Sequence, residues 1–307
     1  MENARALTEF PDFKDRIAAF VSLASTEITT HDEKLIPELA ETLPTKATVY
    51  VAHTPKASLH DVVRVSCKVQ SAGLAASPHI VARRVTSANA LRDGLTQLCA
   101  AGVQQVLLVA GDCETPMGPY RHTLDLIDSG VLTGSGISRI GVAGHPEGMK
   151  GVDAEQLWQA LHHKQQFGRR TGIRVHIATQ FGFDPEGVCN WVRTLAQREI
   201  ALPVHVGLAG PTSFTKLVRF AMLCGVGASL HSASKNLKAV GNVARMATTP
   251  EQMIPALVEC GAGVDLGQIV QPHFFTFGGA LASARWIRGI SQGNFDIRTD
   301  GKLALHS

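Results

Sequence analysis

QVLLVAGD (105–112) is a short apolar run that ends in Asp112, a residue that can exchange protons and accept hydrogen bonds. Similar runs, each ending in polar or turn-forming residues, recur along the chain: VSLASTEI (21–28), ATVYVAHT (47–54), LAASPHI (74–80), RIGVAGHPEG (139–148), RVHIATQ (174–180), PVHVGLAGPTS (203–213) and PHFFTFGG (272–279). Reactive side chains at the carboxyl ends of successive strands are typical of a (β/α)₈ TIM barrel. In such a barrel these strand ends form one rim, and the functional site lies there.

Segments with helical spacing of apolar residues separate these runs, and several begin at a capping residue such as Ser58, Ser87 or Asp153. The regular alternation predicts an α/β protein with a parallel sheet, and eight strand candidates favour a closed barrel. We expect one domain over 1–307, with a short N-terminal helix, a lid or extra helix in 228–248, and a peripheral C-terminal tail. The expected helices are 9–20, 32–43, 58–72, 87–101, 153–167, 185–198, 213–224 and 250–261.

The composition indicates a globular chain with a small charge. Its 307 residues are 45% hydrophobic and 18% charged, with a formal net charge of +3, which predicts no nucleic-acid partner. The pairs Arg83-Arg84 and Arg169-Arg170 are expected to lie in solvated loops.

No secretory signal and no membrane-spanning run is evident, so no membrane partner is expected. The six cysteines include no CxxC pair, which predicts reduced, packed thiols in a cytoplasmic protein.

Seven segments together resemble the methylenetetrahydrofolate reductase family, in an order and spacing that run from about residue 20 to 288. They are STEIT (25–29), ASPHI (76–80), LLVAGD (107–112), VAGHPEG (142–148), IATQFGFD (177–184), SFTKLVRF (213–220) and HFFTFGG (273–279). The resemblance implies an oxidoreductase that interconverts 5,10-methylenetetrahydrofolate and 5-methyltetrahydrofolate by hydride transfer from NADH or NADPH. It also implies FAD as a cofactor, no metal, and possible association into a homo-oligomer.

The resemblance assigns catalytic roles to Glu27, Asp112 and Gln180. Glu27 would be the general acid, because the methylene carbon becomes electrophilic only when protonation opens the five-membered ring to an iminium cation. Asp112 would polarise the pterin, and Gln180 would offer it an amide donor and acceptor. The structural alternatives are a hydrogen bond from Glu27 to a rim loop or a barrel lysine, an N-cap at Asp112 and a buried amide at Gln180 that bridges two strands.

Further residues match the family's substrate-binding positions. Phe181 and Phe220 would stack on the pterin or the aminobenzoyl ring, although phenylalanines at such spacing are often core residues. Lys216 would meet a carboxylate of the glutamyl tail, or else it is a solvated helix lysine. Asp112 and Gln180 would also contact this substrate.

The resemblance gives a set of cofactor-binding residues in which Lys164 would meet the flavin phosphates and Gly111 would allow close approach of the backbone. Several neighbouring positions depart from the family pattern, including Ala110, Leu157 and Ala160. Without flavin, hydride would pass directly from NAD(P)H to the iminium. The expected cofactor-binding set is His79, Gly111, Asp112, Tyr120, His145 and Lys164.

Two other functions remain open from the residues alone. The first is a metal-dependent barrel hydrolase or aldolase, since histidines and carboxylates at strand ends are potential ligands of a divalent ion. The second is a folate-binding or partner-binding barrel without activity. The candidate ligands for the first are His31, His53, His79, His145, Asp112 and Glu147.

Overall fold

The computed structural model describes residues 12–213, 216–217, 247–248, 250–262 and 268–306. Among these residues, eight parallel strands close into a barrel in the order β1-β10-β7-β6-β5-β4-β3-β2. The predicted TIM barrel is therefore confirmed, whereas the extent of the domain, residues 1–307, stays a prediction. The barrel strands are β1 (Ser25–Thr29), β2 (Thr48–Ala52), β3 (Ala75–Val81), β4 (Gln105–Val109), β5 (Arg139–Gly144), β6 (Arg174–Phe181), β7 (Val204–Ala209) and β10 (Ile269–Phe275).

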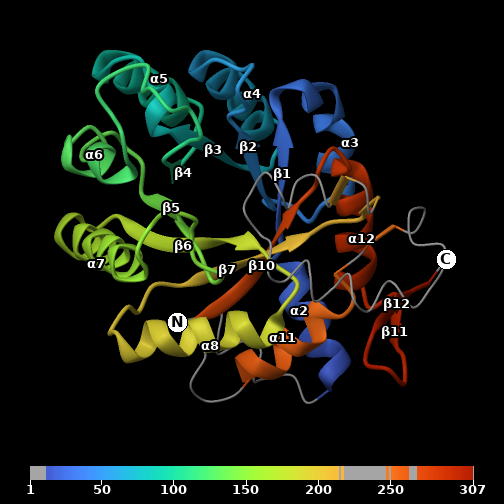
Figure 1. The fold of residues 1–307 in the computed structure, drawn as a ribbon. Helices are drawn as coiled ribbons and strands as arrows, with labels where there is room; N and C mark the ends of the chain where they lie inside the picture. The colour runs from blue at the N-terminus through green and yellow to red at the C-terminus, as the bar shows by residue number, and fades with distance from the viewer. Residues whose placement is uncertain (1–11, 214–215, 218–246, 249, 263–267, 307) are drawn as a thin grey trace.

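Helices surround the strands in a ring, with α2 packed against α12 beside the barrel (Figure 1). Local capping fixes several helix starts: the Ser58 hydroxyl caps α4 in a reciprocal box with Asp61, and Asp153 caps α7 in the same manner with Gln156. The helices are α2 (Phe13–Ser22), α3 (Ile36–Thr42), α4 (Leu59–Ser71), α5 (Ala88–Ala100), α6 (Thr123–Asp128), α7 (Ala154–Thr171), α8 (Pro185–Gln197), α11 (Met253–Ala262) and α12 (Ala280–Ser291).

Some elements differ from the sequence-based prediction. Helix α12 lies where only a strand end and a tail were expected, and its buried face, which includes Trp286 and Ile287, covers the barrel. The tail contains a small antiparallel hairpin of β11 (Phe295–Ile297) and β12 (Leu303–Leu305). The predicted lid at 228–248 and helix at 213–224 lie almost entirely outside the described residues.

The barrel interior carries a layer of aromatic polar side chains instead of the usual aliphatic filling. The Tyr50 hydroxyl lies 3.0 Å from His176 Nε2 and so joins β2 to β6 on the opposite side of the barrel. The rings of His176 and His205 stack at 4.1 Å, and Ser25 Oγ lies 2.9 Å from His273 Nδ1. These contacts hold the wall strands at fixed separations below the rim.

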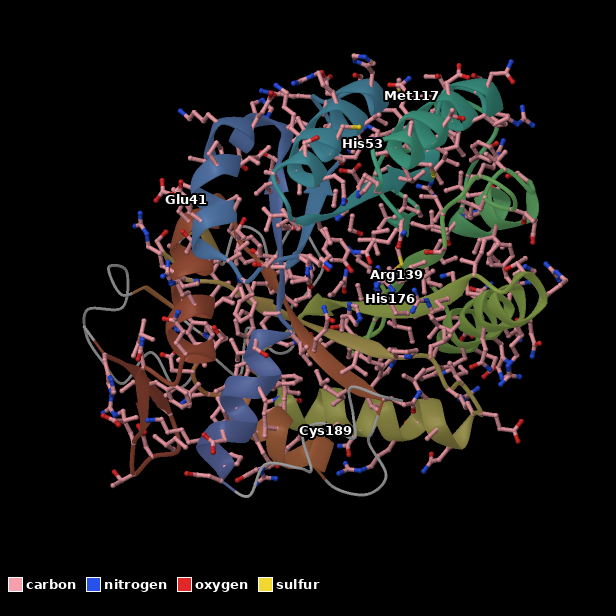
Figure 2. The ribbon with its side chains drawn as sticks, turned by 180° about the vertical axis from the view of Figure 1, so that it is seen from behind. Glu41, His53, Met117, Arg139, His176 and Cys189 are labelled. Atoms are coloured by element: carbon pink, nitrogen blue, oxygen red, sulfur yellow. A yellow bond between two sulfur atoms is a disulfide. The ribbon has the colours of Figure 1, made fainter. Side chains whose placement is uncertain are left out.

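The interior histidines are neutral at physiological pH. Burial lowers the pKa of His176 to about 4 and that of His273 to about 3. Arg139 at the start of β5 lies beside His176 of β6, and its positive charge lowers the pKa of His176 further (Figure 2). The layer therefore supports the rim without adding several positive charges to the barrel interior.

The prediction that the cysteines are reduced thiols is wrong for two of them. Cys189 on α8 and Cys260 on α11 form a disulfide, with their Cα atoms 6.4 Å apart. The two residues are separated by 71 positions, and only the packing of α8 against α11 brings them together. Cys67, Cys99 and Cys113 are free thiols. Within the described part of the chain, no helix is long and apolar enough to span a membrane.

Candidate functional site

Glu27 lies near the carboxyl end of β1, on the same rim as the ends of the other parallel barrel strands. Ser25 shares its strand face two residues earlier and bonds His273 of β10, so this face points into the barrel. Thr276, which follows β10, donates its hydroxyl hydrogen to the Glu27 carbonyl oxygen at 3.1 Å. The backbone N–H of Thr276 also bonds the Glu27 carboxylate. Thr276 therefore fixes the backbone and the side chain of Glu27 at the mouth.

The Glu27 carboxyl group has the proton affinity that a general acid needs near neutral pH. Burial raises the pKa of Glu27 from 4.5 to about 7, and the negative charge of Asp32 adds to the increase, although the hydrogen bond from Thr276 opposes it. A carboxyl group with such a pKa can hold a proton at pH 7 and release it to a bound substrate.

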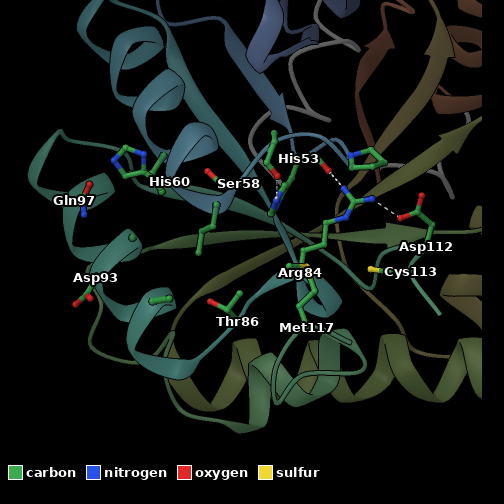
Figure 3. Close-up of a pocket in the computed structure, with 16 residues that line it drawn as sticks. His53, Ser58, His60, Arg84, Thr86, Asp93, Gln97, Asp112, Cys113 and Met117 are labelled. Atoms are coloured by element: carbon green, nitrogen blue, oxygen red, sulfur yellow. Dashed lines mark hydrogen bonds and ion pairs between the residues drawn. The ribbon is translucent and has the colours of Figure 1, made fainter. Parts of the chain in front are cut away.

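Asp112 follows β4 on this rim and forms an ion pair with Arg84, with 2.5 Å between Asp112 Oδ1 and Arg84 Nη2. Arg84 Nη1 donates to the His53 carbonyl oxygen, so one guanidinium connects the ends of β2, β3 and β4 (Figure 3). The Arg84 side chain is only 10% exposed. The prediction of a solvated Arg84 was therefore wrong, because strand closure brings a carbonyl and a carboxylate to it.

A cavity of about 600 Å³ opens beside this ion pair, between helices α4 and α5. Its volume falls in the range of roughly 300–1,000 Å³ that is typical of small-molecule sites. Glu27 is not part of its lining, so Asp112 and Glu27 do not share this particular cavity. The lining is His53, Pro55, Ala57, Ser58, Leu59, His60, Val63, Arg84, Thr86, Ala90, Asp93, Gly94, Gln97, Asp112, Cys113 and Met117 (Figure 3).

Gln180 and His145 are brought together by the neighbouring strands β6 and β5. Their side chains are hydrogen-bonded, and this bond opposes the lowering of the His145 pKa that burial and the nearby Lys164 cause. Gln180 also lines a small cavity of about 120 Å³ with Glu147 and Phe181. The amide of Gln180 therefore joins the ends of β5 and β6 at the rim through a ring nitrogen of His145, which agrees with the strand-bridging alternative.

Aromatic side chains gather at the end of β10. Phe181 is 1% exposed, and its ring packs against Phe275 at 5.5 Å and Phe277 at 5.0 Å. Phe275 lies above His273 on the inward face of β10, with 4.9 Å between the ring centroids. The alternation of β10 could have identified Phe275, which is half-buried and better placed than Phe181 to present a ring at the mouth. Lys216 is exposed, and Phe220 lies outside the described residues.

The residues expected to bind the cofactor do not line one common surface. Tyr120 is 4% exposed and packs within the hydrophobic core. His79 extends into the barrel, where its ring lies 6.0 Å from Tyr50, and burial lowers its pKa to about 4. Lys164 lines a separate cavity of about 160 Å³ with His145.

Gly111 is glycine for a reason that does not involve a cofactor. Its φ is +96°, and a Cβ at this position would lie 2.5 Å from Val81 Cγ1. The backbone conformation and the contact with Val81 therefore require glycine whether or not a cofactor binds.

The described residues contain no group of three or more His, Cys, Asp or Glu side chains arranged to hold a metal ion. The potential ligands instead have separate partners: His53 Nε2 lies 3.1 Å from the Ala57 carbonyl oxygen, and Asp112 pairs with Arg84. The geometry therefore gives no support to a metal-dependent hydrolase.

Comparison with known proteins adds a family match and a fold match. The family model described as methylenetetrahydrofolate reductase matches residues 36–266. The crystal structure of oxaloacetate acetylhydrolase aligns with a TM-score of 0.51 and 11% identity, over 88% of this chain and 81% of that chain. A dihydropteroate synthase from Thermus thermophilus aligns with a TM-score of 0.45 and 13% identity, over 86% and 91% of the two chains. At 11% identity, the match to oxaloacetate acetylhydrolase shows a similar fold and nothing about activity.

Proposed function

The chain belongs to the methylenetetrahydrofolate reductase family, and from this premise we propose that it interconverts 5,10-methylenetetrahydrofolate and 5-methyltetrahydrofolate. NADH or NADPH would donate the hydride, and the methylene carbon would accept it. One proton is consumed together with the hydride when a methyl group forms. The proposal therefore needs a hydride donor, a proton donor and a surface that holds a flat pterin.

Glu27 is the proposed proton donor. In the direction of methyl formation, its proton passes to the departing ring nitrogen as the five-membered ring opens and the iminium cation forms. Hydride then adds to the iminium carbon and the nicotinamide becomes oxidised. The raised pKa of about 7 supports this role, because a carboxyl group of ordinary pKa would be almost entirely ionised at neutral pH.

Asp112 and Gln180 are proposed to orient the pterin and to stabilise charge on it. The Asp112 carboxylate is held in place by Arg84, and the Gln180 amide by His145. A carboxylate fixed near a developing cation lowers the energy of the charged state, provided that its position does not change during the reaction. Phe275 and Glu27 each follow the paired residues Phe274 and Thr26 on neighbouring strands, so Phe275 supplies an aromatic face beside Glu27 on which a bicyclic ring can stack.

The cofactor that the resemblance implies fits these residues poorly. The side chains expected to bind FAD lie in the core, in the barrel interior and in a cavity of about 160 Å³, which is too small to enclose half of a dinucleotide. The proposal therefore uses direct hydride transfer from the reduced nicotinamide. The cavity beside Arg84 and Asp112, of about 600 Å³, has room for the tail of one of the two substrates.

The observation that carries the proposal is the pairing of a family match with a carboxyl group of pKa about 7 at the barrel rim. The test is a turnover assay with 5,10-methylenetetrahydrofolate and NADH or NADPH, followed by chromatographic detection of 5-methyltetrahydrofolate. Product formed in proportion to the oxidised nicotinamide would support it. If pterin binds without turnover in either direction, the chain is a folate-binding barrel and the proposal is wrong.

A further inference from the structure

Lys164, on α7, has a buried amine whose charge is not compensated. The residue is only 6% exposed, no carboxylate forms an ion pair with it among the described residues, and it lines a cavity together with His145. Burial lowers the pKa of Lys164 to about 8, so that the amine is still mostly protonated at pH 7. A buried ammonium group without a partner is unfavourable, and an anion that entered beside it would remove that penalty.

The Lys164 pocket, with a volume of about 160 Å³, gives an anion access to this amine. Its deep end is formed by buried Leu161, Lys164 and Trp191, and its outer end by exposed Gly148 and Ala154. The pocket therefore leads from the surface to the amine. Its lining is Ala143, His145, Pro146, Gly148, Ala154, Leu157, Trp158, Ala160, Leu161, Lys164 and Trp191.

Two tryptophans give the Lys164 pocket a rigid aromatic wall. The rings of Trp158 on α7 and Trp191 on α8 stack with their centroids 5.8 Å apart and an angle of 27° between their planes. The Arg198 guanidinium lies 5.1 Å from the Trp158 ring and is itself held by Glu155 at 2.8 Å. The wall is therefore fixed from outside, and it does not need a ligand to order it.

The size of the pocket limits the ligand to about one ring. Its 160 Å³ is close to the volume of about 150 Å³ of an engineered cavity that binds benzene, and well below the roughly 300 Å³ at which sites for larger ligands begin. An adenosine or a flavin ring with its phosphates exceeds this space.

The lining chemistry distinguishes between classes of anion. Most of the surface is contributed by Ala, Leu, Pro and Trp side chains, which cannot replace the water around a phosphate. A carboxylate attached to an apolar ring can place its charge at Lys164 and its ring along the tryptophan wall. His145 completes the polar end, because its Nδ1 is buried without a partner and its ring lies near the Lys164 charge.

We propose that the Lys164 pocket binds a small aromatic monocarboxylic acid of about the size of benzoate, with the carboxylate at Nζ and the ring against Trp158 and Trp191. The site is distinct from the rim at Glu27, and its binding does not depend on the proposed folate chemistry. It adjoins that rim through His145, which is hydrogen-bonded to Gln180, and through Pro146, which also lines the cavity of Gln180.

Benzoate, its neutral analogue benzamide, inorganic phosphate and ADP are titrated into the full-length protein at pH 7, with tryptophan fluorescence and calorimetry as readouts. We expect benzoate to bind at least about tenfold more tightly than benzamide, since only benzoate offers a charge to the amine. Phosphate and ADP should bind more weakly than benzoate. No turnover is measured, so the result is independent of the folate proposal.

Lys164→Met removes the charge while retaining the length of the side chain, and it should abolish the preference for benzoate over benzamide. Lys150→Met, on the adjacent exposed loop, is the matched control and should retain the preference. The comparison of ligands on the unmodified protein remains decisive if the Lys164 variant does not fold. Equal affinity for benzoate and benzamide, tighter binding of phosphate or ADP, or no binding of benzoate would each overturn the proposal.

Discussion

Arg84 and Asp112 form an asymmetric ion pair, in which the cation is 10% exposed and the carboxylate is 74% exposed. Arg84 also donates to the His53 carbonyl, so the guanidinium has two acceptors from two different strand ends. Asp112 depends on Arg84 for its position, whereas Arg84 would retain one partner if Asp112 were neutral. This difference predicts that removing the charge of Arg84 lowers the free energy of unfolding more than removing the charge of Asp112.

We expect Arg84→Met to lower the free energy of unfolding by about 2 kcal/mol, because hydrogen bonds to a charged group are lost and their acceptors remain. Asp112→Asn should lower it by less than about 1 kcal/mol, since an ion pair with an exposed partner is screened by water. Urea denaturation measures both values. Arg92→Met, at an exposed position of α5, is the control and should change little. Equal losses for the first two variants would contradict the asymmetry.

Glu27→Gln should lower kcat for methyl-folate formation by about 10²- to 10⁴-fold, the typical contribution of a general acid. In the unmodified enzyme, kcat/KM should fall as the pH rises through about 7, because Glu27 then loses its proton. Steady-state assays across pH 5.5–9 test both expectations. Glu41→Gln, on the exposed surface, should leave the profile unchanged. Near-normal turnover of the Glu27 variant would remove Glu27 from the mechanism.

Glu27 should also make stability depend on pH. Its pKa is about 7 in the folded protein against an ordinary value of 4.5 in an unfolded chain, so the folded state binds the proton more tightly. The free energy of unfolding should therefore fall as the pH rises from 4.5 to 7, by up to about 3 kcal/mol, and then level off. The Glu27→Gln variant should not show this fall in the free energy of unfolding, and it should be more stable than the unmodified protein at pH 8. A variant that is less stable at pH 8 would argue against a buried carboxyl group at this position.

The hydrogen bond between Tyr50 and His176 crosses the barrel, and Tyr50→Phe should leave His176 Nε2 without its partner. We expect a loss of about 1–3 kcal/mol in the free energy of unfolding. Tyr120→Phe is the matched control, because Tyr120 is also a buried tyrosine but takes no part in the cross-barrel hydrogen bond, and it should cost less. If both variants denature at the same urea concentration, the cross-barrel bond contributes no net stability.

Freshly purified protein should contain much less than one flavin per chain, since the residues expected to bind FAD are dispersed. The visible absorption spectrum measures bound flavin directly. Added FAD should leave the rate of NADH or NADPH oxidation by methylenetetrahydrofolate unchanged. A stoichiometric flavin spectrum, or a rate that depends on FAD, would contradict this prediction.

The sequence alone was sufficient to predict the barrel and the position of its rim. An apolar run that ends in a polar residue defines a strand and its carboxyl end, and parallel strands place those ends on one side. Glu27, Asp112 and Gln180 were therefore assigned to one rim without coordinates. Helix α12 was not predicted, because the strand and turn pattern at 272–279 looks like the last element of the alternating strands and helices.

The partners of these residues were decided by the closed structure. Arg84 meets Asp112 across 28 positions, Cys189 meets Cys260 across 71, and Tyr50 meets His176 across 126. Lys164 was expected to meet phosphates, yet its surroundings are apolar because α7 and α8 pack two tryptophans beside it. Local periodicity specifies which face of an element is buried, but a side chain's partners and proton affinity depend on neighbours that only the closure of the barrel brings into contact.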